Sequence, residues 1–236
     1  MSEASDLARL EASLRRRFRV IDTPVTLGQT TVWLAHPANS DELISEEDYL
    51  KDERLPYWAE PWPSSFELAR HLMSADSLLG PGAGRRLLEL GCGAGLVASA
   101  AALAGFVVTA SDYYEDALRF TQINAWHATG GGRRVEVLHL DWRAMPEAMP
   151  RYDIVVASDV LYERPNAELV AETLSLTLAS DGVAIVADPG RMAAPAFLAA
   201  VPASGMTITR ARRLPYVEGT VKQTIDLYEI RWALAG

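Results

Sequence analysis

The chain has 236 residues, with 22 basic and 31 acidic side chains, a formal net charge of −9 and a single cysteine. This length suits one domain with a small extension, and it can bury a core without disulfides or a structural metal. The acidic balance argues against nucleic-acid partners, and the single cysteine favours a reducing, cytoplasmic setting. No signal peptide is recognisable, and the longest apolar run, 96–110, is too short and too weak for a membrane span.

The first 54 residues are predicted to form a small extension. Residues 5–18 have the pattern of a short amphipathic helix, and five arginines fall between Arg9 and Arg19. Residues 19–34 alternate apolar and polar side chains, which predicts a hairpin or two edge strands. Seven acids and two bases between positions 41 and 54 are typical of a solvated connector.

From residue 63 onward, helix-like and strand-like segments alternate. Helices are predicted at 63–74, 96–104, 114–127, 166–179 and near 193–201, and strands at 86–90, 106–111, 135–140, 152–158 and 182–187. Such alternation implies right-handed crossovers and a parallel sheet covered on both faces. The last strands, 206–214 and 224–232, have no helix between them and should pair antiparallel at an edge.

The predicted fold class is therefore α/β, with a doubly wound, seven-stranded and mostly parallel sheet that ends in an antiparallel C-terminal edge hairpin. This domain is assigned to residues 55–236. The preceding residues 1–54 form the small β-containing extension.

The segment ELGCGAGL (89–96) links the first parallel strand to its helix, at the sheet edge where doubly wound folds bind ligands. Gly91, Gly93 and Gly95 give the pattern G-x-G-x-G, in which the third glycine comes one residue too early for a dinucleotide fingerprint. The preceding Glu89 suits a cationic amine better than a pyrophosphate. The alternatives are a tight turn that binds nothing and a dehydrogenase, the latter supported only by fold analogy.

Two more acids follow strand ends. Asp112 ends the second strand, where a carboxylate can accept both hydroxyls of a ribose or can cap the next helix. Asp141 and Trp142 follow the third strand, where an acceptor beside a flat aromatic ring suits an adenine. The alternative for this pair is a buried core tryptophan with a turn aspartate.

Together these motifs and the terminal hairpin resemble class I (seven-strand) S-adenosylmethionine-dependent methyltransferases over roughly residues 55–236. SDVLYE (158–163) is similar to the D-x-x-Y signature of methyltransferase family 16, which contains many protein-lysine methyltransferases. PYWAEPWPSSFELARHL (56–72) and DPGR (188–191) are similar to the branch with the electron-transfer-flavoprotein β-subunit lysine and nicotinamide N-methyltransferases.

The resemblance implies that S-adenosyl-L-methionine is the cofactor and assigns residues to it. The implied cofactor-binding residues are Trp62, Glu89, Gly91, Gly93, Gly95, Asp112, Tyr113, Asp141, Trp142 and Ser158. Within this set, Glu89 would lie near the cofactor's amino group, Asp112 would hold the ribose and Trp142 would stack near the adenine. No metal is implied, and the four histidines show no ligand spacing.

Asp159 and Tyr162 are the implied catalytic residues, at the mouth where the methyl group emerges. For an amine acceptor, Asp159 can bind and orient the nitrogen, and the ring face of Tyr162 can favour a cationic centre. The alternative gives Asp159 a helix-capping role and Tyr162 a core role.

The favoured function is N-methylation of a lysine on a protein partner. The alternatives are a small amine or nicotinamide-like acceptor, and a cofactor-binding module without catalysis. The arginines between Arg9 and Arg19 form either a solvated helix face or a docking surface for an acidic protein.

Overall fold

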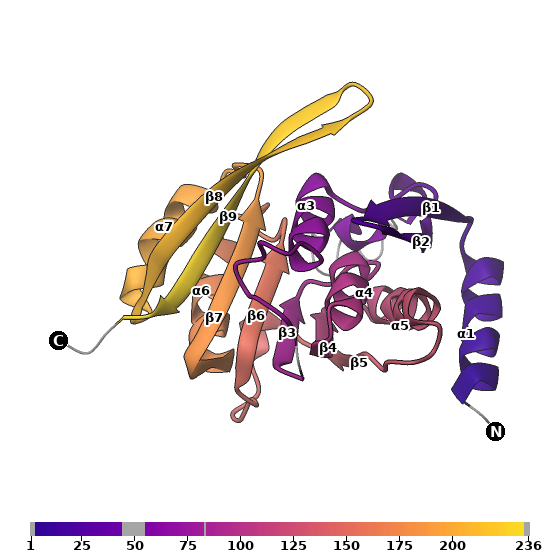
Figure 1. The fold of residues 1–236 in the computed structure, drawn as a ribbon, viewed down its shortest axis with the longest axis horizontal. Helices are drawn as coiled ribbons and strands as arrows, with labels where there is room; N and C mark the ends of the chain where they lie inside the picture. The colour runs from indigo at the N-terminus through magenta and orange to yellow at the C-terminus, as the bar shows by residue number, and fades with distance from the viewer. Residues whose placement is uncertain (1–2, 44–54, 83, 234–236) are drawn as a thin grey trace.

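The computed structural model of the protein describes residues 3–43, 55–82 and 84–233 (Figure 1). Its N-terminal part contains α1 (Glu3–Arg17), the antiparallel strands β1 (Val20–Leu27) and β2 (Thr30–Pro37), and the short turns η1 (Asp41–Leu43) and η2 (Tyr57–Ala59). The predicted helix and hairpin are therefore present. Most of the predicted connector at 41–54 lies outside the described residues.

The remaining elements alternate in the predicted order. They are α3 (Pro63–Leu72), β3 (Arg86–Leu90), α4 (Leu96–Leu103), β4 (Val107–Asp112), α5 (Glu115–Thr129), β5 (Glu136–His139), η3 (Trp142–Ala144), β6 (Tyr152–Ser158), α6 (Asn166–Thr177), β7 (Leu178–Asp188), α7 (Ala194–Ala203), β8 (Met206–Glu218) and β9 (Val221–Trp232). The seven strands form one sheet in the order β5-β4-β3-β6-β7-β9-β8. The first five strands in this order are parallel, and β9 is antiparallel to both β7 and β8. The predicted fold class is confirmed.

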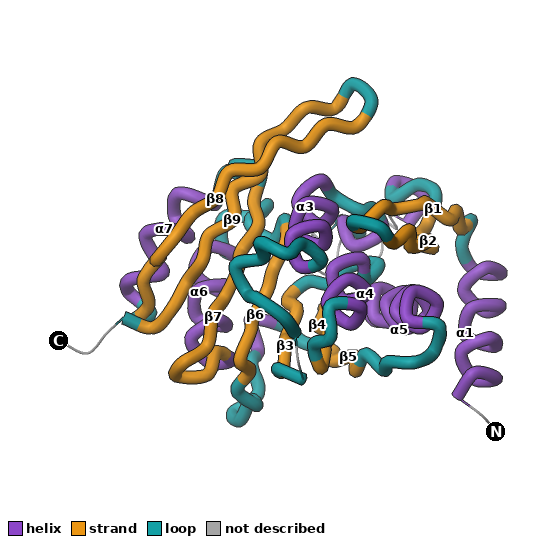
Figure 2. The backbone as a smooth tube through the Cα atoms, in the orientation of Figure 1, coloured by secondary structure: helices purple, strands orange, loops and turns teal. Residues whose placement is uncertain are grey.

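The predicted boundary between α6 and β7 was wrong. The pattern placed a helix to residue 179 and a strand from 182, but β7 already begins at Leu178. Leu178 is fully buried and pairs with Tyr152 across an irregularity in the ladder, so burial on the sheet outweighs its helix propensity. The terminal strands are also longer than predicted. They meet at Gly219, whose φ of 56° closes the turn, and the hairpin extends beyond the rest of the sheet (Figure 2).

Successive side chains along the strands point to opposite faces of the sheet, where they belong to two separate hydrophobic cores. Leu87 of β3 joins the core with α3, α4, α5 and the N-terminal hairpin, whereas its neighbour Leu88 joins the core with α6 and α7. This period of two is what a doubly covered parallel sheet requires. The N-terminal hairpin thus shares a core with the main sheet.

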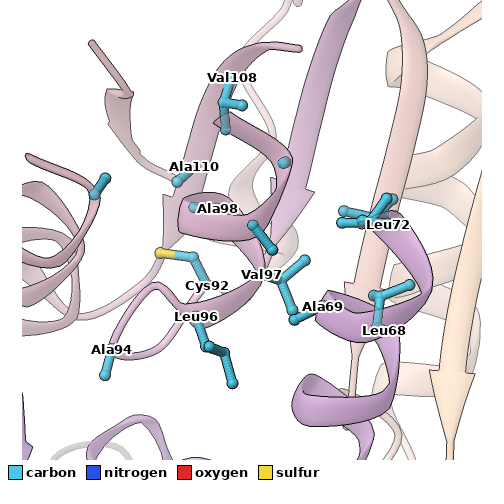
Figure 3. Close-up of a cluster of buried hydrophobic side chains, with 14 of the residues drawn as sticks. Leu68, Ala69, Leu72, Cys92, Ala94, Leu96, Val97, Ala98, Val108 and Ala110 are labelled. Atoms are coloured by element: carbon cyan, nitrogen blue, oxygen red, sulfur yellow. The ribbon is translucent and has the colours of Figure 1, made fainter. Parts of the chain in front are cut away.

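Helix α4, which follows the glycine turn, consists mainly of alanine and serine between its leucines and one valine. All of its positions from Leu96 to Ala102 are buried. Its small side chains let α3 approach closely, so that Leu68 and Ala69 lie beside Val97 (Figure 3). This packing fixes the first turn of α4, and with it the glycine turn. Among the described residues, no helix has the length and apolar character needed to cross a bilayer.

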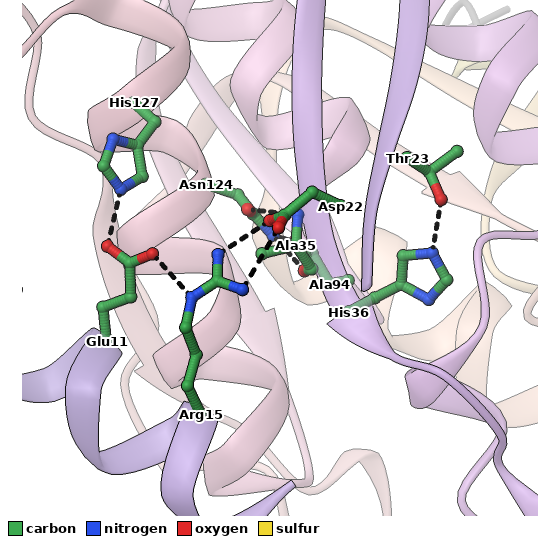
Figure 4. A network of polar contacts seen from close by, with 9 residues as sticks. All are labelled: Glu11, Arg15, Asp22, Thr23, Ala35, His36, Ala94, Asn124 and His127. Atoms are coloured by element: carbon green, nitrogen blue, oxygen red, sulfur yellow. Dashed lines mark hydrogen bonds and ion pairs between the residues drawn. The ribbon is translucent and has the colours of Figure 1, made fainter. Parts of the chain in front are cut away.

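Helix α1 lies against α5 at one end of the molecule and makes ion pairs with its surroundings (Figure 4). Arg15 bonds Glu11 at 2.9 Å and Asp22 at 2.7 Å, and Glu11 also contacts His127 of α5 at 2.8 Å. Other arginines of the group pair with acids of the same chain: Arg9 with Asp6, Arg17 with Asp116, and Arg19 with Glu42.

Candidate active site

A cavity opens at the carboxyl ends of the parallel strands, around the central strand β3. The strand order reverses beside β3, which is the topological switch point where doubly wound sheets bind ligands. Residues following β3, β4, β5 and β6 line the cavity together with the segment before α3. The predicted site residues among them are Trp62, Gly91, Gly93, Gly95, Asp112, Tyr113, Asp141, Trp142, Ser158, Asp159 and Tyr162. The structure therefore brings together all but one of the predicted site residues.

Gly91 and Gly93 of the turn keep the cavity open by lacking side chains. Both have positive φ, 68° and 52°. A Cβ on Gly91 would lie 3.0 Å from Val160 Cγ1 and 3.6 Å from the ring of Trp142. A Cβ on Gly93 would lie 3.1 Å from the carbonyl oxygen of Trp58. The backbone at these positions can therefore meet a ligand directly.

Gly95 has a different role in the structure from its neighbours. It has a φ of 85°, and a Cβ there would lie 2.7 Å from the Thr121 Cα atom of α5. The missing side chain therefore lets α4 begin directly against α5. Gly95 lines the cavity, but this packing alone accounts for the glycine.

Glu89 is the predicted residue that does not line the cavity. It is 1% exposed and lies behind the glycine turn, where the backbone N–H of Ala98 in α4 binds its carboxyl group. Its Oε2 atom has no hydrogen-bond partner among the described residues. Burial, reinforced by the nearby Asp112 carboxylate, raises the pKa of Glu89 well above its ordinary value. A cationic amine that reached Glu89 would stabilise its carboxylate form and give Oε2 a hydrogen-bond donor.

Asp112 ties the glycine turn to the start of α5. Its Oδ2 accepts the Gly93 N–H and its Oδ1 accepts the Tyr114 N–H, each at 2.9 Å. The helix itself begins at Glu115, so Asp112 is not its N-cap. Burial raises the pKa of Asp112, while these N–H groups act in the opposite direction. Each carboxylate oxygen keeps acceptor capacity for a ribose hydroxyl.

Aromatic side chains and the ion pair between Arg143 and Asp141 form the end of the cavity that is assigned to the adenine. The Arg143 guanidinium lies 5.3 Å from the ring centre of Tyr113, whose other ring neighbours include His139 at 5.8 Å. Arg143 also bonds Asp141 at 2.8 Å. Trp142 is half-buried and lines the cavity with its ring close to Gly91. The predicted acceptor and aromatic face are both present, although Asp141 already binds Arg143.

Asp159 combines an unusual backbone conformation with a buried carboxylate that is paired with an arginine. Its φ of 58° makes it the one non-glycine residue with positive φ in the described part of the chain. Its side chain is 2% exposed, and its Oδ1 accepts a hydrogen bond of 2.6 Å from Arg191 Nε. Oδ2 has no partner among the described residues. Helix α6 begins at Asn166, so Asp159 does not cap it.

Three aromatic side chains surround the cavity mouth. Tyr162 is 38% exposed, not part of the core, and its ring centre is 4.9 Å from that of Tyr57. Tyr57 also contacts Trp62 at 6.1 Å, and its carbonyl accepts the Trp62 Nε1–H at 2.9 Å. Their ring faces suit a cationic or methylated amine.

Sequence reasoning missed several residues of this site. Tyr57 and Trp58 lie in the stretch that carried the family resemblance, but no pattern distinguished their roles from those of their neighbours. Asn124 of α5 holds the Ala94 carbonyl at 2.7 Å, and no local signal marks it. Arg191 belongs to the DPGR stretch, whose resemblance to the family assigns no role to this arginine.

The donor set fits the predicted cofactor. Gly91 and Gly93 leave backbone exposed, Asp112 offers two acceptor atoms, and the rings of Tyr113 and Trp142 border the same cavity. In the described ranges, no group of three or more histidine, cysteine, aspartate or glutamate side chains is arranged to hold a metal ion.

Residues 47–234 match the family described as a methyltransferase domain. The chain is 34% identical over 107 residues to protein N-lysine methyltransferase METTL21A of Danio rerio, covering 44% of this chain and 49% of the relative. It is 29% identical over 138 residues to the electron transfer flavoprotein beta subunit lysine methyltransferase of Danio rerio, covering 58% and 51%. The match to histidine protein methyltransferase 1 homolog of Dictyostelium discoideum is 29% over 124 residues, covering 51% and 39%.

The chain thus spans about half the length or less of these curated relatives. Among solved structures, magnesium protoporphyrin IX methyltransferase (ChlM) from Synechocystis PCC 6803 with bound SAM is similar, with a TM-score of 0.56 and 21% identity. That similarity covers 80% of this chain and 86% of the other. At this identity it shows a shared fold.

Proposed function

This chain belongs to the methyltransferase domain family, and on that premise we propose that it transfers a methyl group from S-adenosylmethionine to a lysine side chain of a protein. Membership confirms the family and the cofactor predicted from the sequence motifs. The lysine acceptor is supported by two relatives named as lysine methyltransferases, and a third relative is named for histidine.

One observation carries the amine acceptor. Asp159 keeps a buried carboxylate oxygen that has no partner in the described part of the chain, beside a mouth formed by Tyr57, Trp62 and Tyr162. A buried acceptor without a donor is costly, so it indicates a missing N–H donor such as an amine. The aromatic rings stabilise positive charge on that nitrogen as it becomes methylated.

When bound, S-adenosylmethionine would supply the methyl group, and its sulfur would leave with the electron pair of the carbon–sulfur bond; the acceptor nitrogen, which must first lose a proton to water to free its lone pair, would bond the methyl carbon. The chain's own residues orient the partners and exclude water. Asp112 and the glycine turn hold one side, and Asp159 aligns the acceptor lone pair.

The experiment uses cofactor labelled in its methyl group, incubated with the pure protein and a cell lysate. We expect label in protein, released as methyllysine on hydrolysis. The variant Asp159→Asn should lower the rate about 100-fold or more, because it removes the carboxylate while asparagine tolerates the positive φ. Asp181→Asn, at the exposed start of β7, is the matched control and should stay within twofold of wild type.

The other outcomes would each contradict this proposal. Label released as methylhistidine would identify a protein-histidine acceptor instead. Label confined to small molecules would favour the second candidate, which one observation supports: most residues of the segment from Leu55 to Trp62 line the cavity. Cofactor binding with no transfer to any fraction would leave a silent binding module. A cytoplasmic location stays a prediction based on the single cysteine.

A further inference from the structure

Arg191 connects the carboxylate of Asp159 to Trp62 at the cavity mouth. Its Nε donates to Asp159 Oδ1 at 2.6 Å, and its guanidinium carbon lies 5.1 Å from the ring centre of Trp62. The Asp159 side chain is 2% exposed and that of Arg191 is 33% exposed. A charged bond between such groups is directional and stronger than one in open solvent.

The loop that carries Arg191 is itself held in place. Asp188, at the end of β7, accepts the Gly190 N–H at 2.7 Å and the Arg191 N–H at 2.8 Å with the same oxygen. The Asp159 N–H in turn bonds the Ala187 carbonyl at 2.9 Å. The segments after β6 and β7 are thus joined at backbone level, so Arg191 reaches Asp159 from a fixed support.

This arrangement determines which part of Asp159 a ligand can use. Arg191 occupies Oδ1 and leaves Oδ2 as the oxygen available to an acceptor nitrogen. The pairing also offsets the charge of a buried carboxylate in a rarely populated backbone conformation, which would otherwise be costly. Because an amine must be uncharged to attack a methyl group, orientation by a charge-balanced carboxylate suits the reaction better than a lone anion that retains an ammonium.

We propose that Arg191 is a positioning residue for methyl transfer, which acts through Asp159 by fixing the orientation of its free oxygen. This inference rests on the proposed function, because it assumes that Asp159 orients the acceptor. Nothing in it requires Arg191 to touch either substrate.

The test is a double-mutant cycle on the full chain with the acceptor identified as above. Arg191→Met should lower kcat about 10- to 100-fold, the range found when the support of a site residue is removed, with less than a threefold change in the acceptor KM. Arg191→Lys, which keeps the charge without the planar fork, should recover part of the loss. In the Asp159→Asn background, Arg191→Met should have no further effect on kcat.

Arg164 provides the matched control. It is exposed in the segment between β6 and α6, and Arg164→Met should keep kcat within twofold of wild type. Dissociation constants for S-adenosylhomocysteine, measured calorimetrically, should change less than threefold in all variants. Equal kcat for Arg191→Met and wild type, or losses in the double variant that multiply, would overturn the proposal.

Thermal unfolding separates this inference from the proposed function. It is measured on the four proteins of the cycle: wild type, Arg191→Met, Asp159→Asn and the double variant. If the wild-type protein methylated no acceptor, the proposed function would fail, but the cycle in Tm would still report the contact. A Tm loss in Arg191→Met that shrinks in the Asp159→Asn background supports the coupling. Tm losses that add independently refute it.

Discussion

Asn124 of α5 joins the N-terminal hairpin to the glycine turn. Its side chain accepts the Ala35 N–H at 2.8 Å and donates to the Ala35 carbonyl at 2.8 Å and to the Ala94 carbonyl at 2.7 Å (Figure 4). It is 2% exposed, so water cannot replace these bonds. One amide thus satisfies backbone groups from two segments that are distant in sequence.

We expect Asn124→Ala to lower the free energy of unfolding by about 2–3 kcal/mol, because three buried backbone groups lose their partner. The affinity for S-adenosylhomocysteine should fall at least about threefold, since Ala94 belongs to the glycine turn. Urea unfolding and calorimetry measure the two effects. The control Gln122→Ala, on the same helix, should cost about 0.5 kcal/mol or less. An equal loss in both variants would refute the bridging role.

The residues predicted from the sequence are those whose position follows from local order. Gly91 and Asp159 come directly after a buried strand and Asp112 is the last residue of one, and parallel strands end at one edge of the sheet. Asn124 and Arg191 act through contacts with segments far away in the chain, and their own neighbours give no sign of it. The positive φ of Asp159 is likewise not marked by its sequence neighbours, although aspartate adopts this conformation more readily than most non-glycine residues.

Helix α1 illustrates how an element can be predicted while its surroundings are not. The spacing of its apolar residues predicts the helix, because Leu7, Leu10 and Leu14 recur on one face. In the structure this face packs against the hydrophobic core. Its arginine-rich face left a docking surface open as one interpretation. Glu11, one partner of Arg15, lies four residues before it on the same helix, but Asp22 of β1 and Asp116 of α5, which pair with Arg15 and Arg17, come from other elements that no local pattern could reveal. Similarly, the start of β7 depends on pairing with β6.

These pairs lead to a prediction about the arginine face of α1. Arg15→Ala should lower the free energy of unfolding by about 0.5–1 kcal/mol, since its pairs with Glu11 and Asp22 are partly exposed and screened. Because those charges are already paired within the chain, kcat/KM for the acceptor should change less than twofold between 50 mM and 300 mM salt. Arg16→Ala, on the same exposed face, is the control for stability. A KM increase that depends on salt in both variants would restore the docking hypothesis.

Across the whole molecule, buried carboxylates gather at the edge of the sheet that carries the cavity. Glu89, Asp112 and Asp188 lie at or near the carboxyl ends of β3, β4 and β7, and burial raises the pKa of each. A raised pKa means that the folded state holds its protons more tightly than the unfolded state. The stability that this difference contributes is full below the unfolded pKa of about 4 and is lost as pH rises through the folded pKa. The fold therefore carries a cost at neutral pH that is concentrated at its binding edge.

Glu89→Gln tests this cost, because the amide keeps the shape and the acceptor for the Ala98 N–H while removing the charge. Near pH 4 the variant and wild type should have similar Tm values, since both carry an uncharged group. The variant should become relatively more stable as pH rises to 8, and each 1 kcal/mol gained would raise its Tm by about 2–4 °C. Glu168→Gln, exposed in the first turn of α6, should show a Tm difference from wild type that does not vary with pH.

The same variant tests whether Glu89 binds the cofactor's amino group. If it does, Glu89→Gln should bind S-adenosylmethionine at least about tenfold more weakly than wild type while being more stable, as expected where a site residue is retained for function at a cost in stability. If the Tm difference between Glu89→Gln and wild type does not change with pH, the charge of Glu89 does not limit stability. If the two proteins bind S-adenosylmethionine equally well, Glu89 does not bind the cofactor.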